Sequence, residues 1–118
     1  MNDYLFVYGT LMQNHNNYYA QLVQKNSSLI GNGFIYAKKY DLGDYPGIKI
    51  CNSKTQQTFG EVYQIKNNLN LILKELDYYE GYNSENPKES LFIRKKVTVF
   101  TEGANTIKAW VYEYVKKT

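Results

Sequence analysis

Apolar and polar residues alternate along the C-terminal part of this chain in the pattern of half-buried β-strands. The alternation runs through residues 91–101 and again through residues 106–114. The four residues between them, Glu102-Gly103-Ala104-Asn105, have turn chemistry, so the two segments predict a β-hairpin. A shorter alternating segment, residues 60–65, predicts another strand.

Four further segments are short and apolar rather than strictly alternating. The first, residues 4–8, is aromatic and β-branched and ends at Gly9-Thr10, which predicts a buried strand that enters a tight loop. The other three segments predict strands over residues 29–36, 40–42 and 48–51. Asp44-Tyr45-Pro46-Gly47, between the last two, is typical of a turn because proline presets φ and glycine accepts positive φ.

A helical spacing of i, i+3, i+4, i+7 and i+11 connects five residues: Leu69, Ile72, Leu73, Leu76 and Glu80. This spacing predicts one buried face of a helix. Asn67 or Asn68 is placed to cap the start of that helix, and Gly81 is placed to end it. A second, shorter helix is predicted over residues 14–23, where four apolar or aromatic residues share helical spacing.

The predicted elements amount to six or seven strands, mostly joined by short turns, and two helices. This set favours the α+β class, with a largely antiparallel, strongly curved sheet or barrel. The chain has 118 residues and contains no linker, repeat or low-complexity tract. We therefore expect a single domain over residues 1–118.

The chain has one cysteine, Cys51, and one histidine, His15. A structural zinc site normally needs four Cys or His ligands, so that class of protein is excluded. No intrachain disulfide can form, which fits a reducing compartment. The longest apolar run is too short to span a membrane, and no basic segment precedes an apolar one at the N-terminus. We expect a cytoplasmic protein without a membrane partner.

The formal net charge is +3. A solvated lysine-rich surface accounts for it, and a weak preference for anionic ligands is the alternative. Thirteen tyrosines on a curved sheet could also stack single-stranded nucleic acid. Against that, the lysines are scattered and Arg94 is the single arginine, so we expect no nucleic-acid partner.

A carboxylate is the best available acid–base group in this chain. His15 lies in a polar stretch that is typical of a capping or surface histidine, and Cys51 fits a small core residue better than a nucleophile. Glu80 differs from the other carboxylates because the helical spacing puts it on the apolar face, near the helix end. Desolvation and the helix dipole would both raise its pKa, as suits a group that exchanges protons near neutral pH. The alternative is that the helix end frays and turns Glu80 toward solvent.

Residues 7–11, Val-Tyr-Gly-Thr-Leu, form a second candidate site. Successive backbone N–H groups after a strand can bind an anion, and glycine permits close approach of a ligand. Many ordinary strands also end in Gly-Thr, so this feature alone does not identify a site.

Five segments, in this order and spacing, resemble a known family: Tyr8-Gly9-Thr10-Leu11, Tyr45-Pro46-Gly47, Gly60-Glu61-Val62-Tyr63, Leu76-Asp77-Tyr78-Tyr79-Glu80-Gly81-Tyr82, and Phe92-Ile93-Arg94. The chain is similar to the gamma-glutamylcyclotransferase-like superfamily, in its small branch of AIG2-like and gamma-glutamylamine cyclotransferase-like proteins. His15 also matches, because family members often carry a histidine shortly after the first segment. The resemblance covers nearly the whole chain.

The resemblance implies a small barrel-like α/β fold with a cavity at one end, and a reaction that uses neither metal nor organic cofactor. That reaction releases a gamma-glutamyl group as 5-oxoproline together with a free amine or amino acid. Tyr8, Gly9, Thr10 and Leu11 would hold the glutamyl group, and Glu80 would accept the proton.

Phe92 departs from the family pattern, which often has tyrosine at this position. Tyr45, Tyr79 or Tyr82 is a candidate to supply the missing hydroxyl, and we expect Tyr45 and Tyr82 to contact substrate. The departure leaves a second hypothesis open: a non-catalytic module that binds a small metabolite or a protein on the same fold.

Overall fold

The computed structural model describes residues 3–9, 17–43, 46–83, 85–102 and 105–116. Its elements follow one another along the chain with short connections: β1 (Asp3–Val7), α1 (Tyr18–Asn26), β2 (Ser27–Asp41), β3 (Pro46–Ile50), β4 (Gln57–Ile65), α2 (Leu69–Glu80), the short 3-10 helix η1 (Pro87–Glu89), β5 (Phe92–Thr101) and β6 (Thr106–Tyr114). No helix in these ranges is long and apolar enough to cross a membrane.

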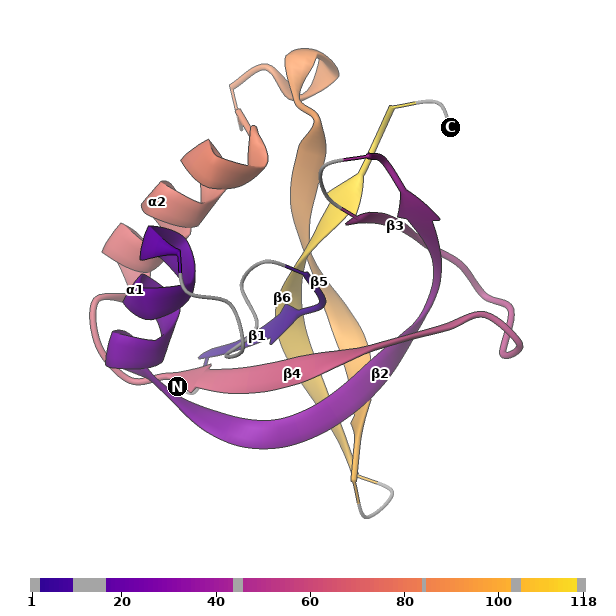
Figure 1. The fold of residues 1–118 in the computed structure, drawn as a ribbon, viewed down its shortest axis with the longest axis horizontal. Coiled ribbons are helices and arrows are strands. Elements are labelled where there is room, and N and C mark those ends of the chain that lie inside the picture. The colour runs from indigo at the N-terminus through magenta and orange to yellow at the C-terminus, as the bar shows by residue number, and fades with distance from the viewer. Residues whose placement is uncertain (1–2, 10–16, 44–45, 84, 103–104, 117–118) are drawn as a thin grey trace.

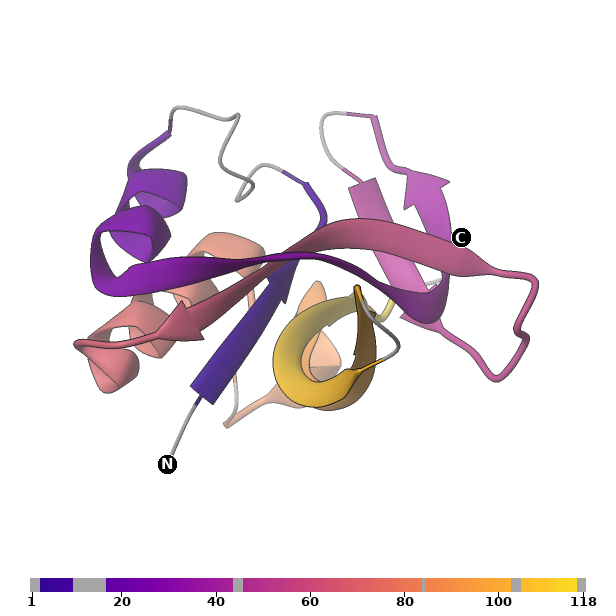
Figure 2. The ribbon, with the colours of Figure 1, turned by 90° about the horizontal axis from the view of Figure 1, so that it is seen from below.

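The six strands form one strongly curved sheet (Figures 1 and 2). The strand order is β3-β2-β4-β1-β6-β5, and β2 also pairs with β5 at Gly33 and Phe34. That additional pairing closes five strands into a barrel, with β3 attached to β2 outside the ring. Neighbouring strands are antiparallel except β1 and β6, which are parallel. The predicted α+β class with a mostly antiparallel, barrel-like sheet is confirmed.

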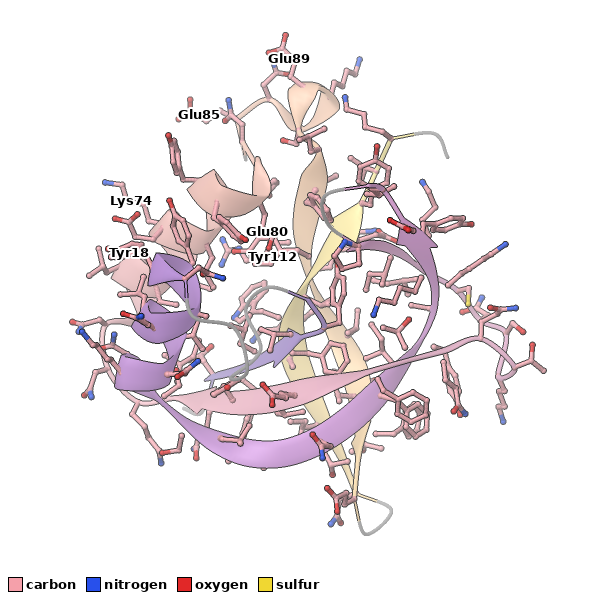
Figure 3. The ribbon with its side chains drawn as sticks, viewed as in Figure 1. Tyr18, Lys74, Glu80, Glu85, Glu89 and Tyr112 are labelled. Atoms are coloured by element: carbon pink, nitrogen blue, oxygen red, sulfur yellow. The ribbon has the colours of Figure 1, made fainter. Side chains whose placement is uncertain are left out.

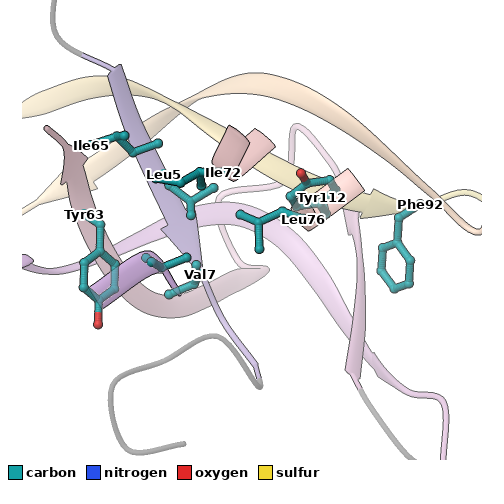
Figure 4. Close-up of a cluster of buried hydrophobic side chains, with 9 residues drawn as sticks. Leu5, Val7, Tyr63, Ile65, Ile72, Leu76, Phe92 and Tyr112 are labelled. Carbon is teal, nitrogen blue, oxygen red and sulfur yellow. The ribbon is translucent and has the colours of Figure 1, made fainter. Parts of the chain in front are cut away.

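Strand alternation divides the buried side chains between two cores. On β1, Phe6 points into the barrel, whereas Leu5 and Val7 point to the face that the helices cover. The helix-side core is drawn in Figure 4, and its buried members are Leu5, Val7, Val23, Tyr63, Ile65, Ile72, Leu76, Phe92 and Tyr112. Because both faces of β1 are buried, this strand reads as a continuous apolar run.

The two helices pack against each other on one side of the barrel (Figure 1). The rings of Tyr19 on α1 and Tyr79 on α2 stack with their centroids 4.2 Å apart. The predicted buried face of α2 is present, with Ile72 and Leu76 fully buried. Asn68 precedes the helix as expected, but its side chain donates to Asn26 Oδ1 instead of capping the helix.

Three further sequence-based expectations differ from the structure. Residues 29–36 and 40–42 belong to one strand, β2, which continues from Ser27 to Asp41 with a bulge between Leu29 and Gly31. The first helix ends at Asn26 rather than at residue 23, while residues 14–16 lie outside the described ranges. Cys51 is not a core residue, because it follows β3 and is partly exposed.

Gly60 permits the close contact between β4 and β1. A Cβ atom built on Gly60 would collide with the Val7 carbonyl oxygen and approach the Phe6 ring to 2.9 Å. Since one contact is with backbone of a central strand, the neighbour cannot move away without disturbing the β1–β4 pairing.

We therefore expect Gly60→Ala to lower the free energy of unfolding by about 2–3 kcal/mol or more. Urea denaturation followed by circular dichroism measures the change. Gln57→Ala, at the exposed start of the same strand, is the control and should change stability by less than about 0.5 kcal/mol. Equal stability of the two variants would contradict this account of the β1–β4 contact.

Candidate functional site

Glu80 is the last residue of α2, and its position is set by the way that helix ends. Gly81 adopts a left-handed conformation with φ 73°, and its N–H is bonded to the carbonyl oxygens of Asp77 and Tyr78. The Tyr82 N–H also donates to the Asp77 carbonyl, at 2.8 Å. These bonds complete the final helical turn, so Glu80 is held in helical geometry rather than on a frayed end.

The Glu80 side chain is partly buried, and it lies between α2 and the sheet near Tyr112 (Figure 3). Burial raises the pKa of its carboxyl group from 4.5 to about 7. Removal from water disfavours the charged form, and the fully buried Ile72 and Leu76 on the same helix face exclude water there. The group can therefore both accept and return a proton near neutral pH.

Two tyrosines from the sheet lie near Glu80. Burial and then the negative charge of Glu80 raise the pKa of the Tyr8 hydroxyl. Burial and hydrogen bonding to Asp77 raise the pKa of the Tyr112 hydroxyl, with a further contribution from Glu80. Both phenols consequently keep their protons at neutral pH.

Asp77, one turn before Glu80, connects α2 to two strands. Its Oδ1 accepts a hydrogen bond of 2.7 Å from the Tyr112 hydroxyl on β6 and lies 3.1 Å from Nε of Arg94 on β5. The Arg94 guanidinium in turn lies over the Trp110 ring, 4.7 Å from its centroid. Burial raises the pKa of the Asp77 carboxyl, while Tyr112 and Arg94 both act to lower it.

The predicted substrate-binding loop is described only at its beginning. Tyr8 and Gly9 lie at the end of β1, whereas Thr10, Leu11, His15 and Tyr45 lie outside the described residues. A Cβ atom on Gly9 would lie 3.0 Å from Cγ of Pro46. Gly9, directly after β1, and Pro46, the first residue of β3, are therefore in close contact.

Tyr82 lies two residues beyond the end of α2. It lines a shallow groove of about 500 Å³. The other lining residues are Asn70, Leu73, Lys74, Asp77, Tyr78, Asn83, Glu85 and Arg94. Glu80 is not among the lining residues, so the structure does not bring Tyr82 and Glu80 together in this groove. Tyr79, the other candidate for a replacement hydroxyl, stacks on α1.

Phe92 is buried in the helix-side core, where its ring packs edge to face with that of Tyr114, with the centroids 5.4 Å apart. Within the described residues, no group of three or more His, Cys, Asp and Glu side chains is placed to hold a metal ion. Glu80, beside two neutral phenols and the end of β1, offers acid–base chemistry.

Sequence reasoning missed Tyr112 and gave Asp77 no role. Tyr112 falls at an inward position of an alternating strand, so the pattern marks it as core. Asp77 is 35 residues away from it along the chain, and no spacing rule joins a helix position to a strand position at that separation. The only sequence feature that pointed to Asp77 was its place as the second residue of the family-like segment Leu76–Tyr82.

The chain is similar to known proteins over nearly its whole length. The model of the family described as "Gamma-glutamyl cyclotransferase, AIG2-like" matches residues 5–118. A protein of Methanocaldococcus jannaschii named "Putative gamma-glutamylcyclotransferase" is 31% identical over 112 residues, which cover 95% of this chain and 84% of that protein. The gamma-L-glutamyl-butirosin B gamma-glutamyl cyclotransferase of Niallia circulans is 32% identical over 115 residues, covering 93% of this chain and 65% of the relative.

Solved structures share the fold. An AIG2-like protein from Mus musculus matches with a TM-score of 0.71 at 21% identity, over 99% of this chain and 80% of that one. YkqA from Bacillus subtilis matches with a TM-score of 0.71 at 23% identity, over 97% of this chain but 36% of that one. Together with the match over residues 5–118, these relatives place the chain: it belongs to the AIG2-like gamma-glutamyl cyclotransferase family.

Proposed function

We propose that this protein is a gamma-glutamyl cyclotransferase that converts a small gamma-glutamyl amine or amide into 5-oxoproline and a free amine. The observation that carries the proposal is Glu80, a partly buried carboxyl group with a pKa of about 7 at the end of α2. The Niallia circulans relative is named for a gamma-glutamyl group joined to butirosin B, which supports a gamma-glutamyl substrate.

In the proposed reaction, the α-amine of the substrate attacks its own γ-carbonyl carbon. The attack is intramolecular, so holding the glutamyl chain bent removes much of the entropic barrier. The amine is protonated at neutral pH and must first lose a proton. Glu80 accepts that proton as general base and returns it to the leaving nitrogen as general acid.

The backbone N–H groups of Gly9, Thr10 and Leu11 would bind the α-carboxylate or the oxyanion that develops on the γ-carbonyl oxygen. The rings of Tyr8 and Tyr45 would wall the cavity and exclude water. Exclusion matters because attack by water would give glutamate in place of 5-oxoproline. The absence of a cofactor, and a cytoplasmic location, remain predictions.

A non-catalytic binding module on the same fold is the second candidate function. Phe92 favours it, because this side chain is buried against Tyr114 and offers no hydroxyl to a substrate. A module of this kind would still bind 5-oxoproline or a glutamyl analogue. A thermal shift with those ligands, in the absence of turnover, would identify it.

We expect Glu80→Gln to lower kcat by about 10²–10⁴, because a neutral amide cannot accept the ammonium proton. The assay incubates the protein with gamma-glutamyl-ε-lysine, gamma-glutamyl dipeptides, gamma-glutamyl alkylamines and glutathione, and detects 5-oxoproline by mass spectrometry. Glu89→Gln, an exposed residue of η1, is the matched control and should keep full activity. Residual activity of Glu80→Gln within about tenfold of wild type would exclude Glu80 as the base.

The pH dependence should follow the Glu80 carboxyl group. Because the carboxylate form is active, kcat/KM should rise with pH to a plateau with a midpoint near 7. A profile that is flat between pH 5 and 8 would show that another group accepts the proton.

Stability should change in the opposite direction over the same range. The folded pKa exceeds the ordinary value of 4.5, so the contribution of Glu80 to stability is complete below about pH 4.5 and is lost as the pH rises through about 7. Urea denaturation at pH 5 and pH 8 should show the loss in wild type and not in Glu80→Gln. At pH 8 the variant should be more stable, by at most about 3 kcal/mol.

A larger side chain at Gly9 should weaken substrate binding. The Cβ atom would press on Pro46, and the branches of valine would block approach of the substrate to the backbone. We expect Gly9→Val to raise KM at least about tenfold, and Gly9→Ala to raise it less. Steady-state kinetics at saturating and limiting substrate separate KM from kcat, and an unchanged KM in Gly9→Val would contradict a substrate contact at this loop.

A further inference from the structure

A chain of hydrogen bonds connects α2, β6 and β1 beside Glu80. The Tyr112 hydroxyl donates to Asp77 Oδ1 at 2.7 Å, and the Tyr8 hydroxyl donates to the Tyr112 carbonyl oxygen at 2.7 Å. The backbone N–H of Ile48 is bonded to the same Tyr8 hydroxyl. Arg94 forms an ion pair with Asp77: its Nε lies 3.1 Å from Oδ1, the same oxygen that accepts the Tyr112 bond.

Both phenols are close enough to Glu80 for its charge to raise their pKa values. Asp77 and Glu80 are three residues apart on one helix and are therefore neighbours on its surface. A phenol has one proton to donate. The proton of Tyr8 is bonded to a backbone carbonyl and that of Tyr112 to Asp77, so neither is donated to Glu80.

The destination of these protons decides how strongly Glu80 can bind a proton of its own. A hydrogen bond donated to a carboxylate stabilises its charged form and weakens its basicity. In the part of the chain that the structure describes, Glu80 accepts no such bond, and burial is the cause of its raised pKa. A neighbouring phenol that turned toward Glu80 would remove that property.

We propose that Asp77 is a positioning residue for Glu80: it binds the Tyr112 hydroxyl proton, so that this phenol does not donate to Glu80 and the Glu80 carboxylate remains available to the substrate ammonium group. Arg94 fixes Asp77 in this role, and its guanidinium is itself held over the Trp110 ring. The availability of Glu80 to a substrate ammonium group rests on the proposed function, whereas the effect of Asp77 on the Glu80 carboxyl group does not.

Among the described residues, the titratable groups that interact with Glu80 are Tyr8 at the end of β1 and Tyr112 on β6. Asp77 precedes Glu80 by one turn on α2, and Arg94 on β5 contacts Asp77. Glu113, also on β6, acts on Tyr8. It is bound by the Ile50 N–H at 2.8 Å and by Lys95 Nζ at 2.7 Å.

The test follows the Glu80 carboxyl carbon by NMR in protein labelled with ¹³C at the glutamate side-chain carboxyl, and Glu80→Gln identifies the signal. We expect Asp77→Leu to lower the Glu80 midpoint by about one pH unit, because leucine has a similar shape but no acceptor and releases the Tyr112 proton. Asp77→Asn keeps an acceptor oxygen and should keep the wild-type midpoint. Equal shifts in the two variants would mean that Asp77 acts through its charge, which overturns the proposal.

Tyr112→Phe completes a double-mutant cycle with Asp77→Leu. It should leave the Glu80 midpoint unchanged, and in combination with Asp77→Leu it should restore the wild-type midpoint. A rise of about one unit in Tyr112→Phe would show that Tyr112 donates to Glu80 in the wild type, and a shift that persists in the double variant would exclude Tyr112 as its source. Tyr112→Phe alone keeps the proposal testable if Asp77→Leu does not fold.

Tyr63→Phe is the matched control for stability. It also removes a buried phenol that donates to a carboxylate, Glu61, at 3.2 Å. It should lower Tm about as much as Tyr112→Phe and leave the Glu80 midpoint unchanged. In active protein, the acid limb of kcat/KM should move with the NMR midpoint of the free protein in every Asp77 variant. If Asp77→Leu shifts the Glu80 midpoint but the wild-type protein shows no turnover, the proposed function is rejected and the role of Asp77 is retained.

Discussion

Glu80 can be held out of water only while the inner face of α2 stays packed on the sheet. Ile72 and Leu76 supply that packing, and the bond from Tyr112 to Asp77 fastens the last turns of the helix to β6. Gly81 then ends the helix immediately after Glu80. The raised pKa of Glu80 is therefore a property of the docked helix, and in an isolated α2 this carboxyl group would titrate as in an ordinary glutamate.

This docking depends on strands that are buried on both faces. β1 contributes Phe6 to the barrel interior and Leu5 and Val7 to the helix-side core. Its two neighbours, β4 and β6, are fixed by backbone pairing, and Gly60 permits the close approach of β4. Tyr8 and Gly9 therefore follow a strand that is paired on both sides, although it is only five residues long.

Local patterns in the sequence predict the elements whose signals are local. The spacing of apolar residues over 69–80 and the glycine after it predict α2 to within a residue, and the alternation before and after residues 102–105 predicts the hairpin of β5 and β6. The same reasoning divides β2, because Lys38 and Lys39 interrupt its apolar pattern. Both lysines are exposed, and the strand continues through them because β3 pairs with this segment. Pairing between strands is a tertiary effect that a single-segment pattern does not contain.

The candidate site shows the same division. Glu80 is predictable because a carboxylate on an apolar helix face contradicts the pattern around it. Tyr112 agrees with its strand pattern and so gives no signal, and the sequence does not reveal that its hydroxyl meets Asp77.

Asp77 and Glu80 are carboxylates within one turn of the same helix, yet their surroundings give them different chemistry. Burial raises the pKa of both groups. For Asp77, a phenol donor and a guanidinium oppose that effect, so its charge is neutralised by fixed partners. For Glu80, burial is not opposed by any described partner, and the pKa reaches about 7. Two titratable groups with diverging environments are typical of acid–base sites, in which one group transfers the proton and the other holds the surrounding hydrogen bonds. Because Asp77 binds the Tyr112 hydroxyl, this donor does not reach Glu80. The two carboxylates therefore form one functional unit.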